Sequence, residues 1–286
     1  MRWQQSRRSG NVVDARGRGG MGGGFAGRGM KLGCGPLILI GIVALLFGVN
    51  PLEILGLVGG GGGPAPAEAP TGAPGPDDPE ADFASAVLGS TEDAWGQIFS
   101  ASGQQYPPPA LVLYTGLVQS ACGTGSAASG PFYCPGDQRL YLDLSFFNEL
   151  HRLGAPGDFA AAYVIAHEVG HHIQNIQGTL EETQRLQQRL PQAQANRVSV
   201  STELQADCYA GVWGRSAAEQ GLLEPGDVEE GLQAAAAVGD DALQSRAQGT
   251  VVPESFTHGS STDRATWFRR GLESGDPDAC DTFASL

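Results

Sequence analysis

A run of 18 uncharged residues, from Leu32 to Val49, divides this chain and limits which parts can fold together. At about 1.5 Å rise per residue, a helix of that length is just long enough to cross the core of a bilayer. Segments on the two sides of such a helix lie in different compartments and cannot share a hydrophobic core. The sequence therefore predicts a transmembrane anchor over residues 32–58, with the apolar stretch after Asn50-Pro51 at the membrane interface.

Charged residues are distributed unequally about this run. Seven of the 17 basic side chains come before residue 32, together with only one of the 31 acidic ones, Asp14. Because Lys- and Arg-rich flanks stay on the cytoplasmic side, we expect a single-pass protein of the cell membrane with a cytoplasmic N-terminus. The acidic body, which gives the chain its net charge of −14, is then extracytoplasmic. A cleaved signal peptide is the alternative, with Ala65-Pro66-Ala67 as a weak cleavage site, although the apolar run is long for that role.

Composition divides the rest of the chain into three parts. Residues 1–31 are rich in Gly and Arg and nearly free of apolar side chains, so we expect a disordered basic head in the cytoplasm. Residues 59–80 contain five consecutive glycines followed by Pro, Ala and acidic residues, which is typical of a linker. Residues 81–286 form the predicted folded domain.

Periodicity indicates that this domain is mainly helical. Apolar residues recur at roughly helical spacing in the segments 82–100, 146–153, 159–178, 180–190, 201–220, 227–248 and 261–272. Two short stretches, 111–114 and 139–144, predict strands. We expect a loop in the Gly/Ser-rich stretch between the two strands.

The predicted domain contains four cysteines: Cys122, Cys134, Cys208 and Cys280. An even number in an extracytoplasmic domain favours two disulfides. Of the three possible pairings, the local pair Cys122–Cys134 leaves Cys208–Cys280, and buried free thiols are the alternative. A zinc site built from cysteine is disfavoured because no C-x-x-C pair is present. Cys34 is left over beside the apolar run.

The segment His167-Glu168-Val169-Gly170-His171 follows an apolar helical stretch, residues 160–166. Side chains four positions apart lie on one face of a helix, so both imidazoles can bind a single Zn²⁺ ion. Glu168 can then accept a proton from water whose pKa zinc has lowered toward about 7. We expect Gly170 to let another element approach closely. His172 points to a different face and is expected in a supporting or surface position.

A catalytic zinc site needs a third protein ligand and one open position. The metzincin pattern is excluded, because no histidine follows at the required spacing and no methionine follows Met30. His151 lies on a separate predicted helix and is typical of an ordinary, partly exposed histidine. The third ligand is therefore expected to be a carboxylate from another helix.

Glu203 and Asp207 lie four positions apart in a largely apolar helical segment, where carboxylates need partners. We expect Glu203 to complete a His₂Glu ligand set. Asp207 is expected to accept a hydrogen bond from the outer nitrogen of a ligand histidine and so to orient it. Glu181 and Glu182, in a polar stretch, are the competing candidates.

Several stretches of this chain resemble the bacterial family of neutral zinc metallopeptidases, which are membrane-anchored proteins with gluzincin-like sites. The stretches occur in order along nearly the whole chain: MRWQ at 1–4, GPFYCP at 130–135, AHEVGHHIQ at 166–174, ELQADCYAG at 203–211, FTHGSS at 256–261 and CDTF at 280–283. The resemblance implies zinc on His167 and His171 and catalysis by Glu168. The wider gluzincin pattern implies Glu203 as third ligand, with Asp207 behind it. The expected fold is α+β and predominantly α-helical: a zincin-like metallopeptidase domain with a small β-sheet, behind a single N-terminal transmembrane helix.

A peptidase must also stabilise the negative charge that develops on the substrate carbonyl oxygen. His258, in a loop before a predicted helix, is the best candidate, and an exposed loop histidine without this role is the alternative. Tyr209 and Arg264 are weaker candidates. The strand 139–144 is a candidate edge for binding an extended peptide.

These features predict a membrane-anchored zinc metallopeptidase that hydrolyses a peptide or protein substrate, with Zn²⁺ as its cofactor and Glu168 as general base. The alternative is a catalytically weak or inactive zinc-binding interaction module, which the presence of Glu168 disfavours. Nucleic acid binding by the Gly/Arg head is not expected, because the head is short and topology explains its charge.

Overall fold

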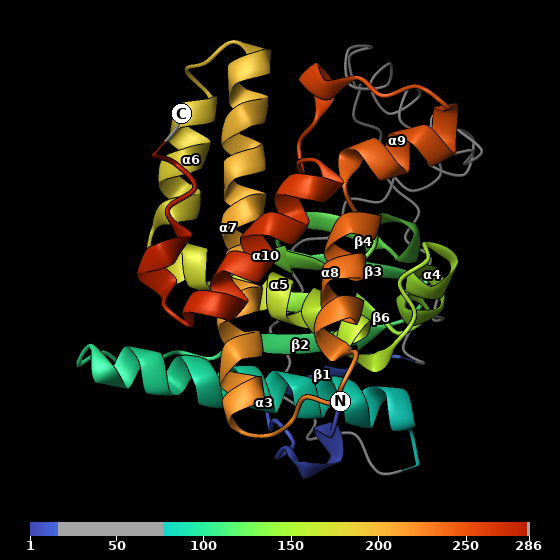
Figure 1. The fold of residues 1–286 in the computed structure, drawn as a ribbon, viewed down its shortest axis with the longest axis vertical. Helices are drawn as coiled ribbons and strands as arrows, with labels where there is room; N and C mark the ends of the chain where they lie inside the picture. Colours follow the sequence, from blue (N-terminus) through green and yellow to red (C-terminus); the bar gives the residue numbers. More distant parts are fainter. Residues whose placement is uncertain (17–76, 285–286) are drawn as a thin grey trace, which may run out of the picture.

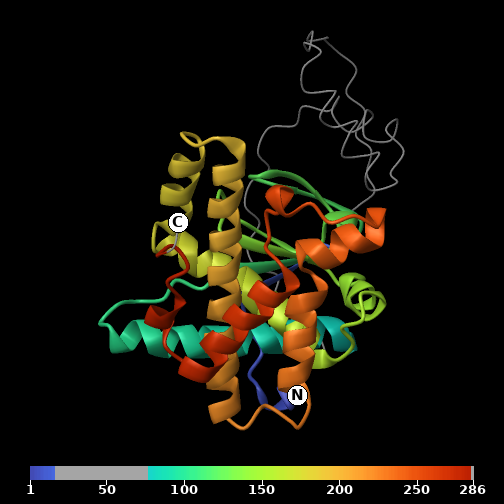
Figure 2. The same cartoon turned by 45° about the horizontal axis from the view of Figure 1, so that its top comes forward.

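The computed structural model describes residues 1–16 and 77–284, which form a mostly helical molecule with two small sheets (Figures 1 and 2). The helices are α3 (Pro79–Ala101), α4 (Phe146–Arg152), α5 (Asp158–Ile176), α6 (Thr179–Gln187), α7 (Gln192–Glu219), α8 (Asp227–Ala237), α9 (Asp240–Gln248) and α10 (Ser261–Ser274). The strands are β1 (Val12–Asp14), β2 (Ala110–Tyr114), β3 (Leu117–Ser120), β4 (Gly123–Ser126), β5 (Phe132–Cys134) and β6 (Arg139–Asp143). This agrees with the predicted mixture of helix and sheet.

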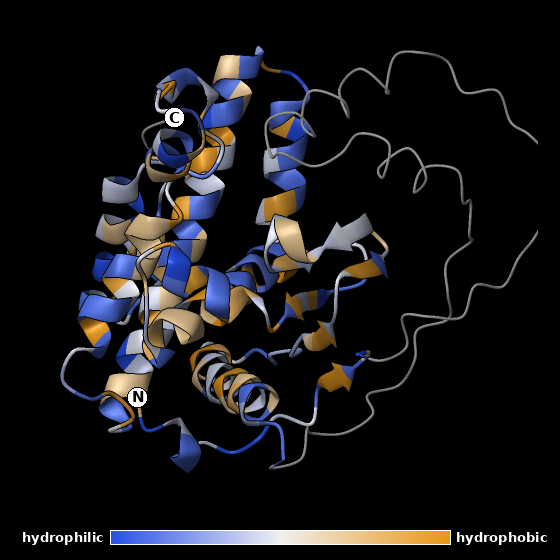
Figure 3. Ribbon diagram, turned by 90° about the vertical axis from the view of Figure 1, so that its right-hand side faces the viewer, coloured by the Kyte–Doolittle hydropathy of each residue, from blue (hydrophilic) through white to orange (hydrophobic). Residues whose placement is uncertain are grey.

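The larger sheet has the strand order β1-β2-β6-β5. Strand β2 is parallel to both of its neighbours, β1 and β6, whereas β5 runs antiparallel to β6. Alternation along β2 divides the core between the two faces of the sheet: Leu111 and Leu113 join the main core with the helices, and Val112 and Tyr114 join a second cluster on the other face. Figure 3 shows the resulting hydrophobic colouring of the strands.

Two of the sheet expectations were wrong. The stretch between the predicted strands is not only a loop, because it contains β3, β4 and β5. The strand predicted at 139–144 is β6, which pairs with β2 on one side and β5 on the other. A paired strand has no free backbone groups to offer a peptide, so β6 cannot bind substrate by edge pairing.

The prediction of a disordered head was wrong for residues 1–16. Val12–Asp14 forms β1 and extends the sheet in parallel with Leu111–Leu113. Val12 is fully buried in the main core and Met1 nearly so. The composition argument failed because few apolar side chains suffice for a segment that adds to an existing sheet. Residues 17–31 lie outside the described part of the chain.

The predicted anchor over 32–58, the linker over 59–80 up to residue 76, and Cys34 also lie outside the described residues. Within residues 1–16 and 77–284, none of the helices combines the length and apolar character that a membrane crossing requires. The anchor therefore stays a prediction.

Most predicted helices are confirmed, with one division. The segment expected as a single helix over 227–248 forms α8 and α9, which are separated at Val238-Gly239. A Cβ atom on Gly239 would lie 2.4 Å from the amide nitrogen of Ser261. The start of α10 therefore packs directly against the backbone at the point where the helix is interrupted. The break places Asp240 at the beginning of α9, where it becomes part of the site described below.

Both predicted disulfides are present. Cys122–Cys134 joins β3–β4 to β5, and Cys208–Cys280 joins α7 to the segment after α10. Helices α7 and α10 cross closely at glycines on both sides, Gly211 and Gly271. The C-terminal segment is thereby held against α7, the helix that carries both predicted carboxylates.

Candidate metal centre

The centre lies where α5 crosses α7. At the crossing, a Cβ atom on Gly170 would lie 2.8 Å from the carbonyl oxygen of Ala206 and 2.9 Å from its Cα. Only a glycine lets the two backbones approach this closely, as the sequence predicted. The contact brings the histidine face of α5 opposite Glu203, about one turn before Ala206, and Asp207, the residue after it.

The three predicted ligands lie together at this crossing. The Nε2 atom of His167 is 3.2 Å from Oε2 of Glu203, and the Nε2 atom of His171 is 3.5 Å from Oε1 of the same side chain. One ligand atom from each residue lies within 4.8 Å of the other two. The three side chains, which come from the two helices α5 and α7, therefore meet at one point.

This arrangement fits a zinc ion. Ligand atoms about 2.0–2.1 Å from a tetrahedral zinc lie about 3.3 Å from one another, close to the separations across this centre. The histidine nitrogens that face the centre are both Nε2, and the carboxylate faces them with both oxygens. Two imidazoles and one carboxylate form the ligand set of a catalytic zinc with an open fourth position.

Asp207 forms a hydrogen bond with His167 and is itself held by two further residues. Its Oδ1 atom accepts hydrogen bonds from Nδ1 of His167 at 2.8 Å and from the hydroxyl of Tyr163 at 2.5 Å. Arg264 donates to both carboxylate oxygens, at 2.8 and 2.9 Å. In the neutral ring that a metal requires, the proton on Nδ1 faces Asp207, which leaves the lone pair on Nε2, toward Glu203.

Gln174 lies in the corresponding position beside His171, and the sequence reasoning missed it. Its Oε1 atom lies 2.9 Å from Nδ1 of His171. Gln174 is fully buried although it is polar. The available signal was its position three residues after His171, on the same face of the helix.

Burial and charge act in opposite directions on these groups. Burial disfavours the charged imidazole, but Asp207 and Glu203 outweigh it and raise the pKa of His167 to about 10. Burial likewise favours the neutral acid, but His171 and His167 hold the pKa of Glu203 well below its usual value. For Asp207, Arg264 and His167 outweigh burial and lower the pKa. Both carboxylates are therefore ionised at neutral pH, and for Glu203 this is the state that metal binding requires.

Glu168 lies between the two histidines on α5 and is 9% exposed, so little of its side chain reaches solvent. Its charge contributes to the raised pKa of His171, which places the carboxylate beside the centre. This is the position expected of a base that acts on a water molecule at the fourth ligand position.

His258 reaches the same region from the loop before α10. Its Nδ1 atom lies 3.2 Å from Oδ1 of Asp240, and its side chain is half-exposed. The hydrogen bond to Asp240 is the main cause of the raised pKa of His258, and Glu203 contributes through its charge. Oδ2 of Asp240 accepts the backbone N–H groups of residues 257, 258 and 259, so one side chain holds the loop and the imidazole. The sequence reasoning missed Asp240, because it lay within what looked like one continuous helix.

The remaining candidates lie elsewhere or have other partners. His151, Glu181 and Glu182 are exposed and do not join the centre, which agrees with their being surface residues. Arg264 is buried against Asp207, and the hydroxyl of Tyr209 donates to Gln177. Both weaker candidates for stabilising the carbonyl oxygen are therefore occupied.

His172 supports the edge of the sheet. It is buried, and its Nε2 atom donates to the carbonyl oxygen of Pro107 at 2.7 Å. Its Nδ1 atom accepts from the hydroxyl of Tyr133 at 3.1 Å. Tyr133 belongs to β5, so this contact fixes the edge strand relative to the helix that carries the two candidate ligands.

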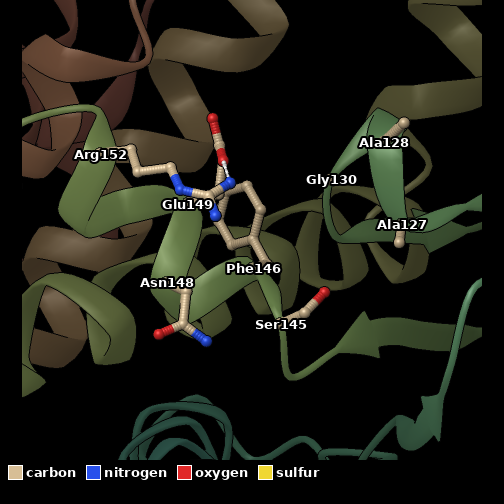
Figure 4. A pocket seen from close by; sticks show the side chains of 8 residues that line it. All are labelled: Ala127, Ala128, Gly130, Ser145, Phe146, Asn148, Glu149 and Arg152. Carbon is tan, nitrogen blue, oxygen red and sulfur yellow. Dashed lines mark hydrogen bonds and ion pairs between the residues drawn. The ribbon is translucent and has the colours of Figure 1, made fainter. Parts of the chain in front are cut away.

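A separate hollow of about 630 Å³ lies between α4 and the segment 127–130 (Figure 4). Phe146, Glu149 and Arg152 line one side, and Arg152 donates to Glu149 at 3.0 Å. None of the candidate metal ligands lines it. Its position next to Gly130 places it near the start of β5.

Comparison with known proteins agrees with this geometry. The model of a protein family described as "Putative neutral zinc metallopeptidase" matches residues 1–283. The chain belongs to this family. Zinc is therefore its cofactor.

Relatives of this chain occur in several bacteria. The chain is 50% identical over 287 residues to the uncharacterized protein YpfJ of Escherichia coli K12, and the alignment covers 99% of both chains. It is 45% identical over 192 residues to the uncharacterized protein Mb2605 of Mycobacterium bovis, covering 63% of this chain and 64% of that one. Rv2575 of Mycobacterium tuberculosis matches with the same identity and coverage. No solved structure matches the chain.

Proposed function

We propose that this protein is an active zinc peptidase in which His167, His171 and Glu203 hold the metal. The observation that carries the proposal is the separation of the ligand atoms, 3.2 and 3.5 Å, which suits a shared tetrahedral ion. Zinc bound there supplies Lewis acidity toward water and toward a peptide carbonyl. The membership of a zinc metallopeptidase family supports the same conclusion.

The side chains divide the remaining work. The carboxylate of Glu168 accepts the proton of the attacking water and returns it to the leaving amine nitrogen. His258, whose pKa the hydrogen bond with Asp240 raises, donates a hydrogen bond in its protonated form to the carbonyl oxygen as negative charge develops on it. Asp207 and Gln174 keep the two imidazoles in the tautomer that faces the metal.

We propose β5 as the edge that binds an extended substrate. Among the described residues, no strand pairs with its outer side, and Tyr133 ties it to α5 through His172. A peptide added to this edge would run beside the helix that carries the centre, with the hollow at α4 near one end of the strand. The substrate is therefore an extended segment of peptide or protein.

The decisive experiment measures zinc content and peptide hydrolysis on the full chain, with Glu168→Gln beside wild type. We expect both proteins to bind zinc, because Glu168 is not a ligand, and only wild type to hydrolyse peptides. The loss should be at least about 10²-fold, the lower end of general acid–base contributions. Glu203→Ala should lose zinc itself.

The outcomes separate the two candidate functions. Zinc binding with equally negligible hydrolysis by wild type and Glu168→Gln would support the inactive binding module instead. Full zinc affinity in Glu203→Ala would show that Glu203 is not a ligand.

A further inference from the structure

The carboxamide of Gln174 has a single orientation. Its Nε2 atom donates to the carbonyl oxygen of Thr202 at 2.7 Å, and a backbone carbonyl can only accept. The same nitrogen donates to Oε1 of Gln205 at 3.0 Å. Both N–H groups are therefore used, and the oxygen must face Nδ1 of His171.

Gln205 is fixed in the same way by the C-terminal segment. Its Nε2 atom donates to the carbonyl oxygen of Cys280 at 3.1 Å, so its own oxygen must face Gln174. Cys280 is tied to α7 by its disulfide with Cys208. Two residues further on, the hydroxyl of Thr282 donates to the carbonyl oxygen of Ser201 at 2.6 Å.

We propose that Gln174 is a positioning residue for His171 and that the C-terminal segment fixes its orientation through Gln205. This proposal rests on the proposed function, since it assigns a supporting role at the same centre. The oxygen of Gln174 can only accept, so Nδ1 of His171 carries the proton and Nε2 keeps its lone pair for the metal. This hydrogen-bond relay, which runs from Cys280 through Gln205 and Gln174 to His171, thus couples the position of residues 280–282 to the orientation of a candidate metal ligand.

Two substitutions separate this role from a purely structural one. Gln174→Leu removes the acceptor and both donors, whereas Gln174→Glu keeps an oxygen facing His171 and loses the amide donors. We expect Gln174→Leu to weaken zinc affinity about 10- to 100-fold, the usual effect of removing such a partner. Gln174→Glu should stay within about threefold of wild type while its thermal stability falls as far as that of Gln174→Leu.

Zinc affinity is measured by competition with a chromogenic chelator on full-length protein that circular dichroism shows to be folded. Equal zinc affinity in Gln174→Leu and wild type would overturn the proposal, as would equal loss in both variants, because that pattern follows stability alone. A wild-type chain that binds no zinc would overturn the proposed function as well.

A second inference follows from an independent set of contacts, those of residues 1–16. Besides pairing through β1, this head bonds along its whole length to the domain over 77–284. The amino group of Met1 donates to Asp158 at 2.5 Å, and the backbone N–H of Ser9 donates to the carbonyl of Ser85. At the end of the head, Arg16 lies 2.6 Å from Asp78.

The basic residues of the head have partners in the domain. Arg7 bonds to Glu92 and Asp93, and Arg8 to Asp82, at 2.6–2.8 Å. With Arg16 and with Arg2, which lies 3.5 Å from Glu224, they make up four of the seven positive charges before residue 32. These four charges pair with acidic side chains of the domain, so membrane orientation is no longer needed to explain them.

We infer that the head and the domain lie on the same side of the membrane. A single crossing between residues 16 and 77 would put Arg16 and Asp78 on opposite sides of a bilayer core about 30 Å thick, whereas their side chains are in contact. The two disulfides favour the oxidising, extracytoplasmic side for both. This replaces the expected cytoplasmic N-terminus and keeps the expected location of the domain.

Cysteine accessibility tests the inference in intact cells. Gln5→Cys in the head and Gln104→Cys in the domain are both exposed, and each is made in a Cys34→Ser background. A membrane-impermeant maleimide should label both sites in intact cells to the extent seen after permeabilisation. Labelling of one site but not of the other would overturn the inference.

A pair of glycines in α3 gives a second measurement on the purified full chain. A Cβ atom on Gly89 would lie 2.5 Å from the carbonyl oxygen of Arg7, whereas one on Gly96 would meet nothing within 4 Å. We expect Gly89→Leu to lower Tm by several degrees and Gly96→Leu to leave it nearly unchanged. Equal Tm values for the two variants would show that the head is not docked.

Discussion

At the scale of single residues, the centre depends on partners that leave each group one orientation. His167 and His171 both present Nε2 to Glu203, because Nδ1 of each is already bonded, to Asp207 and to Gln174. Asp207 is fully buried, and Arg264 bonds it through two nitrogens. A buried carboxylate with this many donors stays ionised and cannot rotate, so it fixes the ring that it holds.

The contact between His258 and Asp240 leads to a prediction about how kcat/KM falls at alkaline pH. The hydrogen bond with Asp240 raises the pKa of His258, so the protonated imidazole persists to higher pH, and the hydrogen bond that it donates to the carbonyl oxygen is lost as pH rises through that pKa. Asp240→Asn removes the negative charge but keeps a side-chain oxygen for the loop N–H groups. We expect kcat/KM of this variant to fall at lower pH than that of wild type.

The measurement is kcat/KM for a peptide between about pH 6 and 10, with His258→Ala as reference. His258→Ala should lose about 10²- to 10³-fold in kcat, as removal of an oxyanion donor does, and should lack this alkaline limb. An unchanged limb in Asp240→Asn would assign it to a different group.

At the scale of elements, the crossing of α5 and α7 determines the distance between the candidate ligands. Gly170 lies between His167 and His171 in sequence, and Ala206 lies between Glu203 and Asp207. The two residues pack directly against each other. Any increase in helix separation at this point moves Glu203 away from both histidines. Stability and metal binding are therefore coupled at this glycine.

We expect Gly170→Ala to lower the free energy of unfolding by about 1–3 kcal/mol, the usual cost of overpacking, and to weaken zinc binding. Gly96→Ala is the matched control, since it also lies inside a helix but has free space around the new methyl group. The control should gain up to about 1 kcal/mol from reduced freedom of the unfolded chain. Urea denaturation and zinc competition measure both effects, and normal zinc affinity in Gly170→Ala would contradict the coupling.

At the scale of the whole molecule, both ends of the described chain close onto the helices that build the centre. The head meets α3 and the start of α5, and residues 280–282 meet α7. The two disulfides contribute differently to this closure. Cys208–Cys280 spans 72 positions and lies beside the relay to His171, whereas Cys122–Cys134 spans 12 and lies by the sheet edge.

Replacing each pair by serine should show this difference. On loop entropy alone, loss of Cys208–Cys280 should cost about 1.5 kcal/mol more than loss of Cys122–Cys134. It should also weaken zinc binding, because Gln205 loses its fixed acceptor, whereas the other pair should leave zinc affinity unchanged. Equal zinc affinity in the two double variants would show that the tail does not act on the centre.

Much of the local structure follows from the sequence. Helical periodicity predicted the helix of His167 and His171, and the four-residue spacings of His167/His171 and Glu203/Asp207 placed each pair on one face. Their assignment as ligands and partner is a prediction that the zinc experiments test. Short strands such as β5 were not predictable, because three residues carry too little alternation.

The sequence by itself determined which side chains share a helix face and which chemistry they can perform, because both depend on spacing and residue type. Only the tertiary structure decided that Glu203 meets the two histidines of α5 at a glycine crossing, that Gln174 is the partner of His171 and that Asp240 is the partner of His258. It also decided that residues 1–16 belong to the same sheet as β2 and β6. These facts depend on contacts between residues far apart in the chain, which neither composition nor periodicity encodes. The apolar run from Leu32 to Val49 also suggested that residues 1–16 lie in a different compartment from the domain, so their place in the sheet could not be predicted.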